Sequence, residues 1–299
     1  MLYYILVENL RFGEKIMKNW LEDQYVILTG ASGGIGRELC KILIEKYRAN
    51  VIGIGRNESK MQSLIRELGE NATRFSYRLF DVGEKSNWQD LRVFLEEKSI
   101  RPVLLINNAG AFPYFRKALD TPSETAEKII RNNVFSILYA TEAISPLLCA
   151  NGKYKPAIVN VASSAALCAV VGTAAYSASK AAVKNYTEAM QLEEKGRMYI
   201  GAIYPGTTAT ELFDGDENVK NSALDKIEMP APKMAKKIAK RILKRKKRSA
   251  LGLDSKAMSF FARIAPVKGV AFVAWIMKIS KSKVFSEVFG YEKKDGSNW

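Results

Sequence analysis

Short apolar runs alternate with longer amphipathic segments along most of this chain. A short apolar run bounded by a turn is typical of a buried strand, and helical patterns between such runs indicate parallel strands joined by crossover helices. We therefore predict an α/β fold with a doubly wound parallel sheet of about seven strands, which binds ligands at the carboxyl ends of those strands. The predicted strands are Val26–Thr29, Val51–Ile54, Arg74–Leu79, Val103–Ile106, Ala157–Val161, Met198–Ile203 and Ala250–Leu253.

These repeats occupy residues 22–255, which we interpret as one domain, because a repeated βα pattern of this length commonly forms a single domain. Residues 1–21 form an N-terminal extension and residues 256–299 an apolar and basic C-terminal extension. The apolar start, Met1–Val7, is too short for a membrane span and lacks the basic start of a signal peptide. A second methionine, Met17, leads to the hypothesis that residues 1–16 do not belong to the functional protein.

A glycine-rich turn follows the first predicted strand and leads directly into a helical pattern. In this context glycines let the backbone approach a pyrophosphate, and the free N–H groups of the helix N-terminus favour its negative charge. The alternative is a purely structural turn, and the position of the turn within a βα unit favours cofactor binding over it. The pattern predicts a Rossmann-type dinucleotide site formed by Gly30, Ser32, Gly33, Gly34, Ile35 and Gly36.

The end of the second predicted strand bears on the choice of dinucleotide. NAD-binding enzymes usually place an acidic residue there, which binds the ribose hydroxyls. Here the strand ends at Gly55 and Arg56 follows, and a guanidinium matches phosphate oxygens in a bidentate geometry. We predict NADP(H) rather than NAD(H). If Arg56 is only a solvated loop charge, the preference stays open.

A hydroxyl, a phenol and an ammonium recur at spacings that suit proton transfer. Tyr176 and Lys180 lie four residues apart in a predicted helix over residues 174–194, so they share one face. A free phenol has a pKa of about 10. A nearby cation favours the phenolate and brings this pKa toward the working range of a general acid/base. The pair alone is more often plain helix surface, but Ser163 precedes it by thirteen residues.

Together these motifs resemble the short-chain dehydrogenase/reductase family over residues 22–255. The resemblance implies that Tyr176 exchanges the proton with the substrate, Ser163 polarises the substrate oxygen, and Lys180 lowers the pKa of Tyr176 and binds the nicotinamide ribose. It also implies that Asn133 kinks its helix and holds a water linked to Lys180. Ser164 and Asn132 are alternatives to Ser163 and Asn133. Two departures from the family pattern, Ala162 and the additional Gly33, remove no catalytic group.

The same resemblance implies three further segments of the cofactor site, each an ordinary turn signal on its own. Asp81 and Val82 would contact the adenine, and Asn108, Ala109 and Gly110 the adenosine ribose. Pro205, Gly206, Thr208 and Thr210 would contact the carboxamide. Family members often form homodimers or homotetramers through the helices that carry Asn133 and Tyr176.

Composition narrows the chemistry. The chain has no histidine, which excludes His-based triads and disfavours a zinc enzyme, so we predict no metal. Three cysteines at unrelated spacings predict neither a disulfide framework nor a metal site and fit a reducing cytoplasm.

The formal net charge of +15 is concentrated in residues 233–248, a basic segment with apolar residues at helical spacing. The segment is interpreted either as a solvated helix packed by its apolar stripe or as a contact with an anionic membrane. Nucleic-acid binding is not predicted, because no groove-reading motif accompanies the charge. Residues 256–285 contain no apolar stretch long enough to span a membrane. They could form a lid, a dimer contact or a peripheral membrane anchor beside the basic segment.

The expected substrate walls are apolar, which favours a hydrophobic ketone or secondary alcohol of steroid or lipid type. Core packing explains some of these residues equally well. The sequence thus predicts an NADP(H)-dependent oxidoreductase that interconverts a carbonyl and an alcohol. The alternative is a non-catalytic NADP-binding regulatory or scaffold protein. The expected wall residues are Phe112, Tyr114, Leu167, Cys168, Val170, Val171, Leu212 and Phe213.

Overall fold

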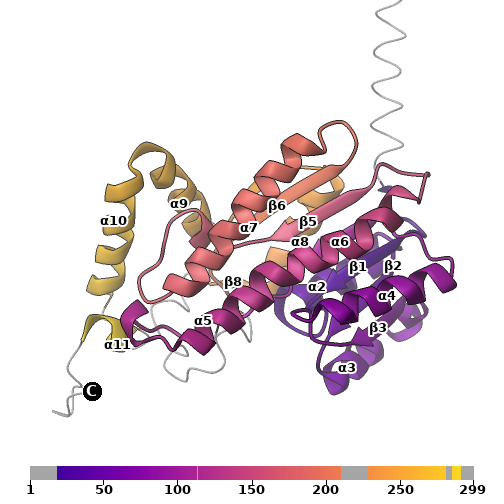
Figure 1. The fold of residues 1–299 in the computed structure, drawn as a ribbon, viewed down its shortest axis with the longest axis horizontal. Coiled ribbons are helices and arrows are strands. Elements are labelled where there is room, and N and C mark those ends of the chain that lie inside the picture. Colours follow the sequence, from indigo (N-terminus) through magenta and orange to yellow (C-terminus); the bar gives the residue numbers. More distant parts are fainter. Residues whose placement is uncertain (1–18, 113, 210–227, 281–284, 291–299) are drawn as a thin grey trace, which may run out of the picture.

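A seven-stranded sheet, parallel throughout, forms the centre of the computed structural model, which describes residues 19–112, 114–209, 228–280 and 285–290. The strand order is β3-β2-β1-β4-β5-β6-β9 (Figure 1), so the direction of winding reverses between β1 and β4. This confirms the predicted doubly wound fold, in which a ligand site is expected at the reversal point. The strands are β1 (Tyr25–Thr29), β2 (Asn50–Gly55), β3 (Phe75–Leu79), β4 (Leu104–Asn107), β5 (Ala157–Val161), β6 (Tyr199–Pro205) and β9 (Arg248–Leu251).

Helices cover both faces of the sheet, which explains why the strands read as continuous apolar runs. Val26 and Leu28 belong to the core cluster on one face, and Ile27 between them belongs to the cluster on the other face. The first face is covered by α2 (Gly34–Lys41), α3 (Glu58–Leu68) and α8 (Ala231–Leu243). The second face is covered mainly by α4 (Lys85–Glu97), α6 (Ser136–Cys149) and α7 (Ala174–Glu193).

The last strand differs from its prediction. It spans Arg248–Leu251, two residues earlier than the predicted Ala250–Leu253. The reason is Gly252, whose φ of 112° lies in a region that other residues rarely adopt and turns the chain out of the sheet. Leu253 therefore begins a helix, α9 (Leu253–Ile264), and its side chain is 85% exposed.

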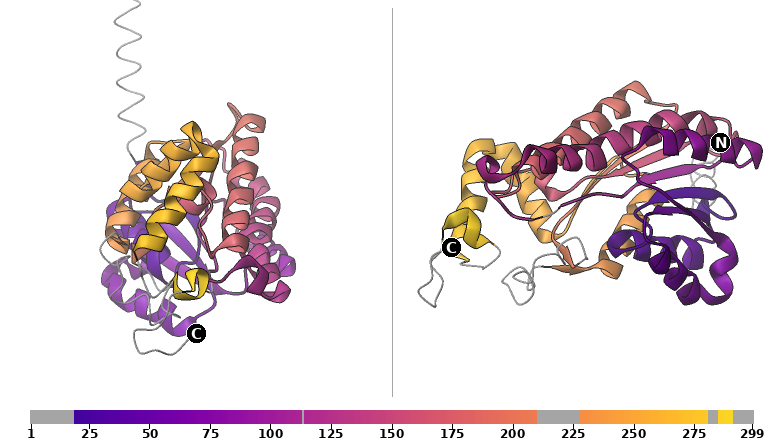
Figure 2. Two further views of the ribbon diagram at one scale, coloured as in Figure 1. Left: turned by 90° about the vertical axis from the view of Figure 1, so that its left-hand side faces the viewer. Right: turned by 60° about the horizontal axis from the view of Figure 1, so that its bottom comes forward.

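The C-terminal extension is helical. After α9 the chain turns back into α10 (Pro266–Ile279), and the two helices pack as a hairpin at one end of the molecule, followed by the short α11 (Ser286–Phe289) (Figures 1 and 2). None of the helices in the described ranges is both long and apolar enough to cross a membrane. The remaining elements are α5 (Ser123–Ile130), the π-helical turns η2 (Ile42–Lys46) and η5 (Arg131–Phe135), the 3₁₀ turns η3 (Gly69–Arg74), η4 (Ala118–Asp120) and η6 (Ser164–Ala166), and the strand pair β7 (Thr208–Ala209) and β8 (Met229–Pro230).

The basic segment contributes α8 and the start of β9. The apolar stripe of α8, including Met234, Ile238 and Ile242, is fully buried in the core between the sheet and α2. Its lysines, such as Lys236 and Lys240, lie on the solvent side. This matches the first interpretation of the segment, a solvated helix packed by its stripe. Consequently α8 keeps no free apolar face with which to enter a lipid surface.

Candidate active site

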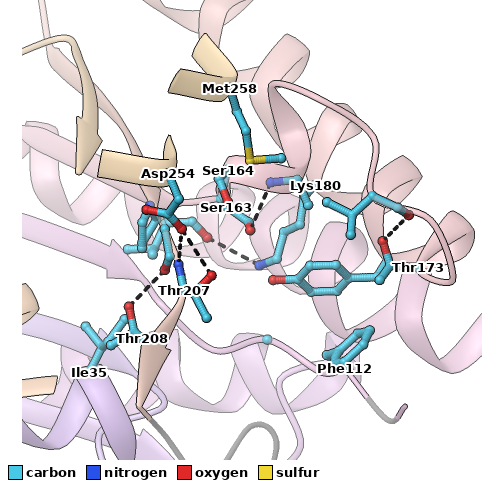
Figure 3. A pocket seen from close by; sticks show the side chains of 18 of the residues that line it. Ile35, Phe112, Ser163, Ser164, Thr173, Lys180, Thr207, Thr208, Asp254 and Met258 are labelled. Atoms are coloured by element: carbon cyan, nitrogen blue, oxygen red, sulfur yellow. Dashed lines mark hydrogen bonds between the residues drawn. The ribbon is translucent and has the colours of Figure 1, made fainter. Parts of the chain in front are cut away.

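A cavity of about 860 Å³ opens at the carboxyl ends of the central strands (Figure 3). Its walls come from the residues that directly follow β1, β2, β4, β5 and β6, together with α7 and the C-terminal helices. Of the predicted site residues, the cavity is lined by Gly30, Ser32, Gly33, Gly34, Ile35, Arg56, Asn108, Ala109, Gly110, Ser163, Tyr176, Lys180, Pro205, Gly206 and Thr208.

The glycine turn lies at one end of the cavity. Gly30 has a φ of +69°, and its N–H donates to Ile54 O at 2.8 Å, which holds the turn against β2. Gly36 does not line the cavity. A Cβ there would collide with Gly30 O and lie 2.6 Å from the Nδ2 atom of Asn108, so glycine is required for the close packing of α2 against the turn. Gly33 is the N-cap of α2, and no side chain caps that terminus. The first N–H groups of α2 therefore face the cavity without a competing acceptor from a capping side chain.

Thr29 joins this turn to the end of β4. Its hydroxyl accepts hydrogen bonds from the N–H groups of Asn108 and Ala109, both at 2.9 Å, and its carbonyl accepts from Asn108 Nδ2 at 3.0 Å. These bonds tie the carboxyl ends of β1 and β4 together. The next residue along the chain, Gly110, lies beside Lys180. A Cβ at Gly110 would lie 3.0 Å from Lys180 Nζ, so a larger residue would crowd that ammonium.

Arg56 lines the cavity at the end of β2 and is mostly exposed. Its Nη1 atom lies 3.5 Å from the Oδ2 atom of Asp81. Asp81 also accepts from Gly83 N at 2.8 Å, and Val82 is a core residue whose carbonyl accepts from the indole N–H of Trp88 at 2.9 Å. Neither Asp81 nor Val82 is among the residues that line the cavity. Arg56 therefore lies at the cavity edge, whereas Asp81 and Val82 form hydrogen bonds within the adjoining turn and with α4.

The hydroxyl, phenol and ammonium converge at the other end of the cavity. Tyr176 and Lys180 project from α7, and Ser163 follows β5. The Ser163 hydroxyl hydrogen-bonds the Tyr176 phenol. Lys180 Nζ lies 5.7 Å from the Tyr176 ring centroid and donates to Val161 O at 3.4 Å. Ser164 also lines the cavity, but Ser163 is the serine that bonds the phenol.

Desolvation dominates the electrostatics of this group. Burial raises the pKa of Tyr176, and the hydrogen bond from Ser163 opposes that rise. Burial also lowers the pKa of Lys180 from 10.5 to about 8. The expected lowering of the pKa of Tyr176 by Lys180 is therefore not what the structure gives. The loss of solvent around each group favours its neutral form.

Asn133 is completely buried in the π-helical turn η5, so the expected irregularity of its helix is present. Its amide bonds the Ala111 N–H at 2.7 Å, the Ala111 carbonyl at 3.1 Å and the Ser179 hydroxyl at 2.9 Å. It therefore ties the loop after β4 to α7 but does not line the cavity. Asn132, the alternative, bonds Lys128 O on its own helix and is the more exposed of the two.

The segment after β6 is fixed by Asp254, a residue not predicted from the sequence. Its Oδ2 atom accepts from the N–H of Thr207 at 2.6 Å and from the Thr207 hydroxyl at 3.1 Å (Figure 3). A Cβ at Gly206 would collide with this carboxylate. The only sequence signal for Asp254 is its place just after the last strand. Thr210, the remaining residue predicted for this segment, lies outside the described residues.

Aromatic and aliphatic side chains form the wall beside the phenol. The ring of Phe112 packs edge-on against Tyr176, with ring centroids 5.1 Å apart, and against Phe115. Phe115 in turn packs against Phe285 of the C-terminal extension. Of the other expected wall residues, Val170 lines the cavity, whereas Leu212 and Phe213 lie outside the described residues. Residues 1–16, to which the hypothesis about the start of the functional protein refers, also lie outside them. Tyr114, Leu167, Cys168 and Val171 are not lining residues.

The C-terminal extension supplies the rest of this wall. Its sequence is compatible with a lid, a dimer contact or a membrane anchor and does not show which of its residues would face the substrate. The helices α9 and α10 cover the cavity and make it largely apolar at this end. The contributing residues are Leu253, Asp254, Ala257, Met258, Phe261, Phe272, Val273, Ile276, Met277 and Phe285.

Comparison with known proteins identifies the class. Residues 24–220 match the family model described as short chain dehydrogenase, and the chain therefore belongs to the short-chain dehydrogenase/reductase family of oxidoreductases. It is 31% identical over 193 residues to a benzil reductase ((S)-benzoin forming) of Saccharomyces cerevisiae, covering 62% of this chain and 72% of that protein. It is 29% identical over 207 residues to a 3β-hydroxysteroid dehydrogenase of Mediterraneibacter gnavus, covering 69% of this chain and 73% of that protein.

Solved structures of the family share the fold. A short-chain dehydrogenase from Burkholderia cenocepacia, in complex with NADP, superimposes with a TM-score of 0.71 at 24% identity. The match covers 85% of this chain and 98% of the other. It therefore extends over most of the sheet and the helices that position the cavity.

Replacement of Lys180 by methionine should stabilise the folded protein at neutral pH. The lowered pKa means that burying the ammonium costs free energy below about pH 8, and methionine removes this cost. We expect Lys180→Met to raise the free energy of unfolding by about 1–3 kcal/mol at pH 7. Between pH 8 and 10.5 the unfolded wild type binds more protons than the folded one, so its stability rises with pH and the difference should shrink.

Urea unfolding of both proteins at pH 7 and pH 10 measures the effect. Lys184→Met, on the same helix, is the control, because Lys184 is partly exposed and pairs with Glu188 at 2.8 Å. The control should show no gain in stability. A Lys180→Met protein that is less stable than the wild type at pH 7 would contradict the cost assigned to the buried ammonium.

Proposed function

We propose that the protein is an NADP(H)-dependent oxidoreductase that interconverts a ketone and a secondary alcohol, with Tyr176 as general acid/base. The observation that carries the proposal is the convergence of Ser163, Tyr176 and Lys180 on one wall of a cavity whose far end is a glycine turn. A nucleotide could span that distance and bring its reactive ring to the phenol. The NADP-bound relative of the same fold supports this choice of cofactor.

The residues present fit such a cofactor. The uncapped N-terminus of α2 offers N–H groups and a positive dipole end to a pyrophosphate, and Gly33 and Gly34 allow close approach. Arg56 at the cavity edge offers a fork of donors to a further phosphate. Gly110 leaves room beside Lys180, so that this lysine can reach the nicotinamide ribose. When bound, NADPH supplies the hydride that reduces the carbonyl carbon.

The proton then comes from the protein. With its pKa raised by burial, Tyr176 stays protonated at neutral pH, which is the form that donates to a carbonyl oxygen. Ser163 donates a hydrogen bond to the same oxygen and holds it near the phenol. The Lys180 ammonium stabilises the phenolate that remains, and its pKa of about 8 keeps it mostly charged at pH 7. In oxidation the same groups act in reverse, with Tyr176 accepting the proton of the alcohol.

The substrate is a hydrophobic carbonyl compound or alcohol. The wall around Tyr176 consists of Phe112, Phe115 and the apolar side chains of α9 and α10. Binding of an apolar ligand to such a wall is favourable because it removes apolar surface from water. The few polar groups of the wall orient the reacting oxygen. Two relatives named as a benzil reductase and a hydroxysteroid dehydrogenase support a substrate with an apolar ring framework. The expected homodimer or homotetramer and the cytoplasmic location stay predictions.

Tyr176→Phe should lower the turnover of NADPH with an apolar ketone by about 100-fold or more, which is the usual contribution of a positioned general acid. The ring packing against Phe112 is kept, so binding of NADPH should change little. The loss of absorbance of the reduced nicotinamide across a panel of cyclic and aromatic ketones measures turnover, and titration calorimetry measures binding.

Tyr186→Phe is the control, because Tyr186 lies on the same helix outside the cavity and should keep wild-type turnover. If Tyr176→Phe keeps full turnover, the role assigned to the phenol is wrong. If the wild type binds NADPH but oxidises none of it with any ketone, and NADP with none of the matching alcohols, the alternative of a non-catalytic NADP-binding protein is favoured.

Arg56→Gln should weaken the binding of NADPH by about 10- to 100-fold and leave the binding of NADH almost unchanged, because a charged hydrogen bond to a phosphate is worth about 1.5–3 kcal/mol. Arg66→Gln, an exposed arginine on α3 away from the cavity, removes the same charge and controls for long-range electrostatics. Dissociation constants for both nucleotides measure the effect. Equal losses for NADPH and NADH would contradict a contact with the additional phosphate.

A further inference from the structure

The α9–α10 hairpin exposes an unusual amount of apolar surface. Phe260, Trp275 and Ile279 are each more than half exposed, at 58%, 55% and 54%. They and their exposed apolar neighbours lie on α9 and α10, which pack side by side at one end of the molecule (Figure 2). We call this surface the hairpin face; it comprises Leu253, Phe260, Ile264, Val267, Phe272, Trp275, Ile276 and Ile279. Exposed apolar patches of this kind mark interaction sites.

Cationic side chains accompany this face. Lys256 and Arg263 are exposed on α9, and Lys268 is exposed on α10. The single acidic residue of the two helices is Asp254, and its carboxylate is directed inward to Thr207. The hairpin face therefore combines aromatic side chains with positive charge and lacks exposed acids. Apolar side chains flanked by lysine and arginine are the pattern that binds at the surface of an anionic membrane.

A second copy of the chain fits the hairpin face less well. A contact between two identical faces related by a twofold axis would bring Lys256, Arg263 and Lys268 close to the same cations of the partner, without acids to offset them. An anionic lipid surface offers the complementary charge. Trp275 also suits that surface, because an indole places its apolar ring among the acyl chains and its N–H near the headgroups.

The hairpin face is continuous with the cavity. Phe272 and Ile276 are exposed on this face and also line the cavity, while Met258, Phe261 and Met277 of the same helices face its interior. The apolar end of the cavity thus borders the hairpin face. A compound dissolved in a lipid layer could pass between these side chains to Tyr176 without entering water.

We propose that the hairpin face docks on an anionic lipid surface and that the cavity takes a carbonyl compound or alcohol dissolved in that lipid. The docking stands by itself, whereas the substrate class rests on the function proposed above. Because α9 and α10 do not span a membrane, the contact is peripheral, with the hairpin lying in the headgroup region.

Vesicle flotation tests the docking. The full chain should float with vesicles that contain phosphatidylglycerol and much less with pure phosphatidylcholine vesicles. The double variant Phe260→Ser/Trp275→Ser should reduce binding at least about tenfold, since two large apolar side chains no longer enter the lipid. Leu192→Ser is the matched control: Leu192 is 76% exposed on α7, outside the hairpin face. It should bind like the wild type, and unchanged melting temperatures would show that all variants fold.

Charge variants separate local contact from general attraction. Arg263→Gln/Lys268→Gln should weaken binding to the anionic vesicles several-fold. Lys236→Gln/Lys240→Gln removes the same charge from the exposed side of α8 and should weaken binding less. Equal losses for the two pairs, or no flotation of the wild type, would overturn the proposal. It is also overturned if the serine variant floats normally but changes the mass measured by light scattering, because the hairpin face then contacts a second copy.

Turnover separates docking from catalysis. With NADPH, the serine variant should reduce a water-soluble cyclic ketone at the wild-type rate but should reduce a long-chain ketone held in anionic vesicles several-fold more slowly than the wild type. Equal rates on the vesicle-held ketone would contradict the proposed substrate class. If the wild type reduces neither ketone but still floats, the proposed function fails and the docking is upheld.

Discussion

The site depends on keeping a lysine charged inside the protein. Lys180 is only 3% exposed, so keeping its ammonium charged costs solvation free energy. Other interactions must therefore hold the helix that carries it in place. A chain of buried amides does this: Asn107 donates to Asn160 at 2.8 Å, and Asn160 donates to Thr187 at 2.9 Å. Thr187 lies two turns after Lys180 on the same side of α7, so this chain fixes the rotation of α7 and hence the direction of the ammonium.

The same helix is fixed from its other end by Asn133. Its amide joins the backbone of Ala111 to the Ser179 hydroxyl, and that hydroxyl donates to Tyr176 O at 2.7 Å. These hydrogen bonds hold the backbone of Tyr176 and, through it, position the phenol. Buried polar groups that are all paired give a rigid arrangement. A rigid phenol, serine and lysine need little reorganisation when a proton moves.

Much of this arrangement could be predicted from the sequence because its determinants are local. The strands are short apolar runs, and the pairing of Tyr176 with Lys180 follows from helical spacing. The contribution of Asp254 could not be predicted, since it depends on how a residue after the last strand folds back on the segment after β6. The raised pKa of Tyr176 was also missed, because spacing shows which charges are near but not how much water is excluded.

Helical α8 and the α9–α10 hairpin also show that apolar periodicity alone does not predict which faces of a helix are buried. Both α8 and the α9–α10 hairpin have apolar residues at helical spacing beside lysines and arginines, so their sequences suggest similar behaviour. In α8 the single apolar stripe is covered by the sheet and α2, so no apolar face of the helix is left exposed. The hairpin has apolar residues on two sides, and the cavity uses only one of them. What covers an apolar face depends on the topology, which packs α8 on the sheet but places the hairpin beyond the carboxyl ends of the strands.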